Sequence, residues 1–292
     1  MISIIVTAFE HSNTIGECIS RILNQENFSE EFELIAACPD NPTKKIIMDY
    51  KKKYPQIIKY ISQDYTHSKN QLMNEIMKIA KGRILIWTDG NKFFEKDVVR
   101  LLVEQFNDEK VGIAGGRIIP LNGKNNLYDY WAHVLTNGLH KMKKRRFKKN
   151  LFIEHTATIL AIRKGIINEI PLDVAEGTII SFLISNKGYK NIYVENAKVY
   201  VKYPSDLNAH FHQRVRSAKA HMTLLRYAKG SNIRYKNFYN EVLFFSFDNL
   251  FDNFLKSLSF ILFLAYIQIR AYYALRIKKN PYCPVWRPKV NP

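Results

Sequence analysis

The first 120 residues alternate between two patterns of hydrophobic and polar positions. Short apolar runs without polar alternation predict buried strands, and they lie at 2–7, 32–37, 57–61, 84–87 and 111–114. Between these runs, apolar residues recur at the spacing of one helix face, at about 13–23, 43–54, 70–81 and 97–107. Buried strands separated by amphipathic helices are typical of a mostly parallel sheet covered on both faces. The pattern therefore predicts an α/β fold.

The pattern changes twice further along the chain. Residues 121–240 are less regular and predict a strand at 156–162 and a helix at 178–187. Beyond 240 the composition becomes strongly apolar, and residues 257–269 carry no charge. We therefore expect one domain at 1–222, made of halves 1–120 and 121–222, followed by a hydrophobic helical segment at 223–292.

The net charge is +18, from 44 basic and 26 acidic residues among 292. Such an excess favours polyanionic partners, namely nucleic acid, anionic lipid heads or phosphorylated ligands, although a solvated lysine-rich surface accounts for much of it. A nucleic-acid-binding protein is the second hypothesis, but the sequence carries no helix-turn-helix, zinc-finger or RNA-binding-strand signature. We therefore expect no nucleic-acid partner.

The three cysteines, Cys18, Cys38 and Cys283, are far apart and form no metal-ligand spacing. Their scarcity indicates a reducing compartment. No signal peptide is expected, because Met1 leads directly into the first predicted strand. The amino-terminal domain is therefore expected to fold in the cytoplasm.

Polar residues follow three of the predicted strands. Ligands of parallel sheets bind at the carboxyl ends of the strands, and those ends carry residues 7–10, 38–40 and 89–91. Taken alone, Asp89-Gly90-Asn91 is ordinary turn chemistry. At the end of a buried strand, however, the Asp89 carboxylate is the kind of ligand through which Mg²⁺ or Mn²⁺ holds a phosphorylated substrate. The convergence of three strand ends favours a ligand site centred on Asp89.

Several short motifs occur in one order along the first 120 residues. They are Ile4–Glu10 with 14–19, Lys69 with Leu72-Met73-Asn74, the strand 84–88 with Asp89-Gly90-Asn91, and 115–120. This ordered set resembles family 2 of the glycosyltransferases, which are inverting, nucleotide-sugar-dependent enzymes of the GT-A fold. The resemblance extends to about residue 220 through Glu176-Gly177 and through Gln213-Arg214-Val215-Arg216, which is similar to the family's Gln-x-x-Arg.

The resemblance implies a donor site for a UDP- or GDP-sugar. The residues expected to bind the donor are Thr7, Phe9, Glu10, Asp40, Lys69, Asn74, Thr88, Asp89, Gln213 and Arg214. Asp40 is expected to contact the uracil or the ribose. Arginines suit a diphosphate because a guanidinium binds its oxygens bidentately, and Arg216 is expected to act in catalysis. The alternative for both arginines is a solvated helix face.

Two departures from the family pattern concern the chemistry. The third position of the Asp-x-Asp motif is the neutral Asn91, so the expected ligands of Mg²⁺ or Mn²⁺ are Asp89 and Asn91 with His212 or His210. Gly177 stands where the family commonly has the aspartate that deprotonates the acceptor. Either Glu176 or Asp173 replaces it as general base, or the acceptor is a lipid phosphate that needs no base. The bland alternative for Glu176 is a helix N-terminal residue.

The apolar segment Phe254–Leu275 suggests contact with a membrane. Its uncharged core, 257–269, would reach only about 20 Å as a helix, whereas a membrane span needs about 20 apolar residues. We therefore expect an in-plane or re-entrant helix at the cytoplasmic membrane face, the alternative being a helix buried in a homo-oligomer interface. The basic run 141–149 suits an anionic surface, or is a mobile loop.

The sequence thus predicts a transferase of glycan biosynthesis whose acceptor is a membrane lipid phosphate or a lipid-linked saccharide. A catalytically inactive membrane scaffold with the same fold is the third hypothesis. Asn91 and Gly177 keep it open, because both depart from the family's catalytic residues.

Overall fold

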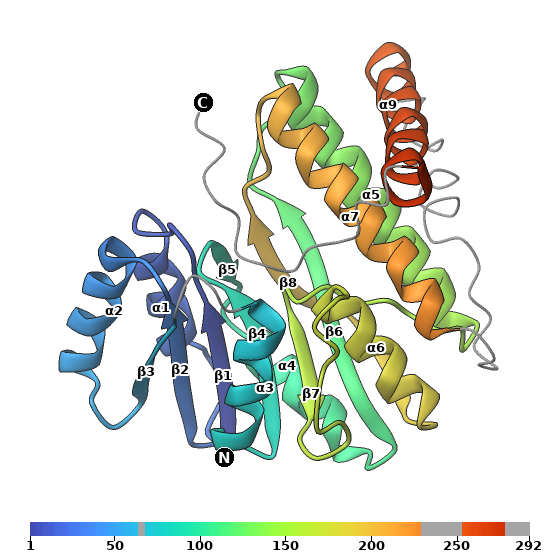
Figure 1. Cartoon of the computed structure of the whole chain (residues 1–292). Coiled ribbons are helices and arrows are strands. Elements are labelled where there is room, and N and C mark those ends of the chain that lie inside the picture. Colours follow the sequence, from blue (N-terminus) through green and yellow to red (C-terminus); the bar gives the residue numbers. More distant parts are fainter. Residues whose placement is uncertain (64–67, 229–252, 278–292) are drawn as a thin grey trace. The chain divides into compact units, whose positions relative to one another are not determined.

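The computed structural model describes residues 1–63, 68–228 and 253–277 (Figure 1). In this part the chain forms two compact units that interleave along the sequence. The first contains Met1–Arg117 and His155–Val199, and the second contains Ile118–Glu154 and the described residues from Tyr200 onward. Neither unit ends at residue 222, because helix α7 (Leu207–Tyr227) runs through that position.

Among the described residues, eight strands form one sheet in the order β3-β2-β1-β4-β7-β6-β8-β5 (Figure 1). The strands are β1 Ile2–Thr7, β2 Phe32–Cys38, β3 Ile58–Ser62, β4 Ile84–Asp89, β5 Lys92–Phe94, β6 Val111–Pro120, β7 Leu160–Arg163 and β8 Lys190–Val201. β1 pairs in parallel with β2 and β4, and β2 pairs in parallel with β3, whereas β7 is antiparallel to β4 and β6. The predicted α/β fold with a mostly parallel sheet is confirmed.

The central strands are buried along their whole length, which is why their sequences lack polar alternation. All six residues of β1 are buried. The helices of this unit are α1 Ile15–Leu23, α2 Asn41–Lys53, α3 Lys69–Ile79, α4 Val98–Val103 with a 3-10 turn at Glu104–Asn107, and α6 Glu176–Asn186. The parallel register places Thr7 beside Asp89 on one side and beside Ala37 on the other. The carboxyl ends of β1, β2 and β4 therefore meet at one edge of the sheet.

Two boundaries in this unit differ from the prediction. Helix α1 begins at Ile15 rather than at about residue 13, and the Thr14 hydroxyl donates to the Gly90 carbonyl instead of capping the helix. The strand predicted at 156–162 is shorter because its first residues turn: the Ile159 amide bonds back to the Thr156 carbonyl. Both differences come from tertiary or turn hydrogen bonds that periodicity does not report.

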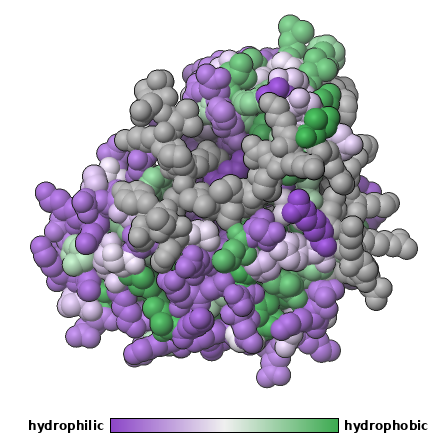
Figure 2. All heavy atoms as spheres, in the orientation of Figure 1, coloured by the Kyte–Doolittle hydropathy of each residue, from purple (hydrophilic) through white to green (hydrophobic). Residues whose placement is uncertain are grey.

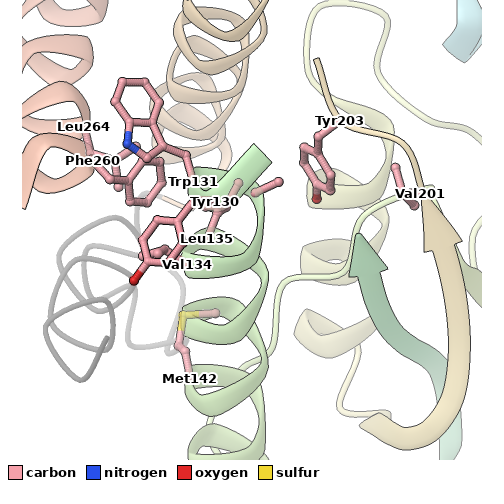
Figure 3. Packing of buried hydrophobic residues seen from close by; sticks show 10 residues of the cluster. Tyr130, Trp131, Val134, Leu135, Met142, Val201, Tyr203, Phe260 and Leu264 are labelled. Atoms are coloured by element: carbon pink, nitrogen blue, oxygen red, sulfur yellow. The ribbon is translucent and has the colours of Figure 1, made fainter. Parts of the chain in front are cut away.

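The second unit contains three long helices, α5 (Leu127–Lys148), α7 and α9 (Phe254–Tyr272), the last continued by a π-helical turn at Tyr273–Ile277. Trp131 lies at the centre of their packing, stacked on Phe263 with ring centroids 4.7 Å apart. Its indole nitrogen donates to the Ser259 hydroxyl over 3.1 Å. Figure 3 shows the surrounding cluster, which includes Phe260 and Leu264 of α9. The predicted hydrophobic C-terminal helix is therefore present as α9.

The basic run 141–149 forms the end of helix α5, so the mobile-loop alternative is wrong for residues 141–148. Lys143 and Arg146 are buried, and the Arg146 guanidinium donates to the Phe152 carbonyl over 2.7 Å. Burial lowers the pKa of Lys143 to about 8, although Glu154 opposes this shift. Two of the seven basic side chains in the run are therefore part of the interior rather than of a surface patch.

One face of α9 is apolar and exposed. Figure 2 shows hydrophobic side chains gathered on this helix at the upper right of the view. The large exposed apolar residues of α9 are Phe254, Leu255, Leu262, Tyr266, Ile269 and Tyr272. Of the helices in the described part of the chain, Phe254–Leu275 alone is long and apolar enough to cross a membrane, and core helices and signal sequences pass the same test.

Candidate functional site

The candidate site begins where β1 and β4 end side by side. The Thr7 hydroxyl donates to Asp89 Oδ1 over 3.1 Å, and the Gly90 amide donates to the Thr7 carbonyl over 2.9 Å. Gly90 is required here, because a Cβ would come within 2.8 Å of Ala8 Cβ and 2.9 Å of Ile15 Cδ1. The turn after β4 is thus held against β1 and α1, and the Asp89 carboxylate is fixed at the edge of the sheet.

Lys69 joins Asp89 to a third element. As the first residue of α3, it places its Nζ 2.6 Å from Asp89 Oδ1 and 3.0 Å from Oε1 of Glu176, the first residue of α6. Burial alone would lower the pKa of Lys69, but the two carboxylates outweigh it and raise that pKa. Burial alone would raise the pKa of Asp89, but Lys69 and Lys92 bring it down to about 2. The cluster therefore holds permanent charges at neutral pH.

A second lysine, Lys92, lies near Asp89. Lys92 opens strand β5, and its ammonium group donates to the Asn91 side-chain oxygen. Burial lowers the pKa of Lys92, Asp89 opposes this effect, and Lys69 adds to it. Sequence reasoning missed Lys92, although its position directly after Asp89-Gly90-Asn91 was a signal available in the sequence.

His11 also lies in this cluster and was not predicted. Its backbone amide donates to the Thr43 hydroxyl over 3.0 Å, which ties the loop after β1 to helix α2. Its ring Nδ1 is buried and makes no hydrogen bond to the described residues. Burial lowers the pKa of His11 to about 4, against the opposing charge of Asp89. The imidazole is therefore neutral at physiological pH and free to donate or accept one hydrogen bond there.

Three expected donor-binding residues are occupied by backbone contacts. The Asp40 carboxylate accepts from the Glu10 amide at 2.8 Å and from the Thr43 amide at 2.9 Å, so it caps α2. The Asn74 side chain donates to the Ile170 carbonyl and accepts from its amide. The Thr88 hydroxyl donates to the Thr158 carbonyl over 2.9 Å. In this structure these side chains position the loops of the site.

Phe9 and Glu10 follow β1 in the same loop as His11. Glu10 has a positive φ of 56°, which turns the chain from the strand toward α1. Its side chain is exposed, whereas Phe9 is half-buried. Asp173 is exposed, in the loop before α6. The structure therefore keeps Phe9 and Glu10 near the end of β1, where the resemblance places a donor loop.

The remaining expected residues belong to helix α7 in the second unit. His212 is exposed, and Gln213, Arg214 and Arg216 are half-buried. His210 packs against Trp131, with ring centroids 6.0 Å apart, and burial is the main cause that lowers its pKa. Both arginines therefore lie on a helix and are only partly exposed, and their roles stay predictions.

Gly177 has no room for a side chain. A Cβ there would lie 2.6 Å from the Ala157 nitrogen, 2.7 Å from the His155 oxygen and 2.8 Å from the Thr156 Cα. All three are backbone atoms, so relieving the contact requires a shift of the chain itself. The absence of an aspartate at 177 is therefore built into the packing of α6 against this loop.

Replacing Gly177 tests this packing. We expect Gly177→Ala to lower the free energy of unfolding by about 1–3 kcal/mol, because overpacking forces backbone shifts. Gly177→Asp should cost at least as much and should not raise the rate of sugar transfer. Gly123→Ala is the matched control, since a Cβ at Gly123 meets nothing within 4 Å. Urea denaturation of the three variants measures the effect, and equal stability of both alanine variants would contradict it.

The side chains around Asp89 are a poor ligand set for Mg²⁺ or Mn²⁺. Asp89 Oδ1 already accepts from Thr7 and Lys69, and the Asn91 oxygen accepts from Lys92. Within the described residues, no group of three or more His, Cys, Asp or Glu side chains is arranged to hold a metal ion. Mg²⁺ and Mn²⁺ usually bind through one or two carboxylates together with substrate phosphates, but here two ammonium groups already pair with the Asp89 and Asn91 oxygens. The expected metal does not fit this part of the site.

Solved structures resemble this fold over nearly the whole chain. A mannosyltransferase from Pyrobaculum calidifontis, in complex with GDP-Man and Mn²⁺, has a TM-score of 0.63 at 15% identity, covering 95% of this chain and 81% of that one. TarS residues 1–349 from S. aureus, in complex with UDP-GlcNAc, has a TM-score of 0.55 at 14% identity, covering 96% and 92%. At these identities the likeness shows the fold, and it confirms the predicted GT-A-like architecture.

Sequence comparison identifies the family of this chain as well as its fold. A poly(ribitol-phosphate) beta-glucosyltransferase from Bacillus spizizenii is 24% identical over 127 residues, which are 42% of this chain and 20% of that protein. The chain thus matches about a fifth of the length of this curated relative. The model of glycosyl transferase family 2 matches residues 3–170, more than half of the chain, and includes Thr7, Lys69 and Asp89. The chain therefore belongs to glycosyl transferase family 2.

Proposed function

We propose that this protein transfers a sugar from a nucleoside diphosphate sugar to an acceptor, with the donor bound at the carboxyl ends of β1 and β4. The observation that carries the proposal is the cluster in which Lys69 bridges Asp89 and Glu176 at 2.6 and 3.0 Å. Strand ends of parallel sheets are where such ligands bind, and family membership supports the reaction class. We propose a UDP- or GDP-hexose as donor, since solved neighbours were captured with GDP-Man and UDP-GlcNAc.

We propose a separate role for each side chain of this cluster. Asp89, held by Thr7 and Lys69, is rigid enough to orient the donor, since its carboxylate cannot rotate without losing both contacts. The cationic groups beside it are placed to stabilise the charge that develops on the departing diphosphate. Arg214 and Arg216 of α7 are further proposed contacts to the diphosphate, and Gln213 to the donor.

The acceptor attacks the anomeric carbon from the face opposite the diphosphate, in the inverting manner that the family resemblance implies. Glu176 is one candidate for the base, and one of its oxygens already pairs with Lys69 at 3.0 Å. Asp173 is exposed and is the other candidate. Since position 177 has no room for an aspartate, we propose an acceptor that needs little deprotonation, namely a lipid phosphate; a lipid-linked saccharide is the second choice.

A donor panel tests the proposed reaction. Purified full-length protein is incubated with UDP-, GDP- and other nucleotide sugars, with and without lipid phosphates, and the released nucleoside diphosphate is measured. We expect release from one nucleotide class, with a rate that rises when the acceptor is added. Absence of release and of donor binding across the whole panel would reject the proposed function.

We also propose that α9 contacts the cytoplasmic face of a membrane. Its exposed face carries Leu262 and Ile269, both more than 60% exposed, flanked by Lys256 and Arg270. Apolar side chains with basic residues at the margins suit an anionic lipid surface. The alternative occupant of this face is a second copy of the chain, which a concentration-dependent oligomer would reveal.

Vesicle flotation tests the membrane proposal. The double variant Leu262→Glu/Ile269→Glu should bind vesicles containing anionic lipid at least about tenfold more weakly. The reason is that two apolar side chains proposed to insert into the lipid are replaced by carboxylates. The control is Ile79→Glu on α3, a residue that is also more than half exposed. Equal flotation of the double variant and the wild type would show that this face of α9 does not contact the membrane.

A further inference from the structure

Two of the side-chain oxygens that the Asp-Gly-Asn motif offers to a cation, Asp89 Oδ1 and the Asn91 oxygen, are already paired with lysine ammonium groups. Lys69 Nζ lies 2.6 Å from Asp89 Oδ1, and Lys92 donates to the Asn91 side-chain oxygen. The two lysines come from different elements, α3 and β5, so their convergence on residues 89–91 is a tertiary feature rather than a local one. Lysine ammonium groups are thus the cations of this site.

The surrounding structure restrains both lysines. Lys92 is followed by Phe93 and Phe94, which are 6% and 2% exposed and anchor β5 in the core. The turn before it is pinned by the Thr14 hydroxyl on the Gly90 carbonyl at 3.0 Å. Lys69 is also held by Glu176, whose Oε1 lies 3.0 Å from its Nζ. Neither ammonium group can leave without breaking contacts that the fold itself provides.

The charges of the cluster balance without a metal ion. Asp89 and Glu176 supply two negative charges, and Lys69 and Lys92 supply two positive charges. A divalent cation would have to share one carboxylate with Lys69, use the neutral amide oxygen of Asn91, and lie beside both ammonium groups. A diphosphate, in contrast, would meet two donors of positive charge at the end of β4, which is the arrangement that stabilises a phosphate leaving group.

We propose that Lys92 and Lys69 take the place of a divalent cation in this chain and bind the diphosphate of the donor directly, an inference that rests on the proposed function. In the reaction the bond between the anomeric carbon and the β-phosphate oxygen breaks, and its electron pair leaves with that oxygen. The acceptor oxygen forms the new bond to the anomeric carbon. A hydroxyl acceptor releases its proton to the solvent or a base, and an ionised phosphate acceptor has none to release. The lysines neutralise the oxygen that departs.

Binding of UDP and GDP, measured by calorimetry with the full-length protein, tests this proposal without reference to turnover. We expect the Kd of the preferred nucleotide in excess EDTA to match the Kd with MnCl₂ within about twofold. Lys92→Met should weaken binding at least about tenfold, because a direct charge-assisted contact is lost. Lys92→Arg, which keeps the charge, should retain most of the affinity.

Lys96→Met is the matched control. Lys96 lies four residues further along the chain, and its Nζ pairs with Glu26 at the surface, where it is 76% exposed. Its replacement should leave the Kd unchanged. Thermal unfolding of each variant shows whether the fold is kept, and the arginine variant separates loss of charge from loss of structure.

Restoring carboxylates provides the reverse test. The double variant Asn91→Asp/Lys92→Asp should bind Mn²⁺ in electron paramagnetic resonance titrations, and its nucleotide binding should become dependent on Mn²⁺, since both changes supply the ligands that the ion prefers. Wild-type protein should show no comparable Mn²⁺ site. Nucleotide binding by the wild type that disappears in EDTA and returns with Mn²⁺ would overturn the inference while leaving the proposed function standing. Failure to bind any nucleotide under either condition would overturn both.

Discussion

Asp89→Asn is expected to lower kcat/KM for sugar transfer by about a hundredfold to a thousandfold, the range for loss of one preorganised group at a reacting centre. The substitution keeps the shape of the side chain but removes its charge. Asp89 Oδ1 receives the Thr7 hydroxyl and the Lys69 ammonium, so the charge is what holds Lys69 in place. A neutral amide leaves Lys69 to Glu176 alone and frees it to move away from the diphosphate.

The measurement is the rate of nucleoside diphosphate release from the preferred donor in the presence of acceptor. Asp49→Asn is the control, because Asp49 is an exposed residue of α2 that pairs with Lys52 at 3.5 Å. It should be as active as the wild type. Full activity of Asp89→Asn would show that the end of β4 is not the reacting centre.

Lys69→Met is expected to lower the free energy of unfolding at pH 7 by about 2–4 kcal/mol. Removing one partner of a buried ion pair leaves uncompensated charge, and here the two carboxylates of Asp89 and Glu176 would lose the ammonium group that bridges them. The range is set below that for fully buried pairs, because these side chains are 14–26% exposed. Urea denaturation measures the loss, and Lys52→Met, which removes an exposed pair, should change stability by less than about 1 kcal/mol.

The same variant has a defined pH signature. The pKa of Asp89 is lowered to about 2 in the folded protein, against about 3.9 in an unfolded chain. Its contribution of about 2 kcal/mol is therefore complete above pH 4 and is lost as the pH falls from 4 toward 2. The stability difference between the wild type and Lys69→Met should shrink over that window. A difference that stays constant down to pH 2 would show that the ion pair is not its source.

The sequence was sufficient for the part of the fold that rests on local pattern. Buried parallel strands have no polar alternation, so β1, β2 and β4 were predicted within two residues of their observed ends. Their parallel pairing also brings Thr7 and Asp89 together, because the carboxyl ends of neighbouring strands share one edge. Lys69 was expected from the family resemblance, and its contact with Asp89 follows from the start of α3 beside that edge.

The remainder depends on contacts between distant residues. Asn74 and Asp40 were expected to touch the donor, but their polar groups are taken by Ile170 and by Glu10 and Thr43, and no local pattern reports such partners. Helix α5 was missed because its buried face carries aromatic residues, a glycine and even Lys143, which obscure the helical periodicity. The contact of Lys92 with the Asn91 side chain depends on the turn at Gly90, and only the folded chain shows this turn.

The two departures from the family pattern, Asn91 and Gly177, also bear on the hypothesis of an inactive scaffold. Loss of function alone would leave the site free to drift, whereas here Lys92 pairs with Asn91 and Gly177 is packed against backbone atoms. The two departures from the family pattern are each accommodated by specific contacts. These contacts favour the proposed transferase over an inactive scaffold.

A crystal structure of the full-length protein with UDP or GDP, grown in EDTA, would show where the nucleotide binds and which cations hold it. We predict that the diphosphate lies at the ends of β1 and β4, with its oxygens within hydrogen-bond distance of the Lys92 ammonium and with Asp89 still paired to Lys69. Nucleotide bound away from residues 7–11 and 89–92 would contradict it, as would protein that binds RNA or DNA with a steep salt dependence and no nucleotide at all.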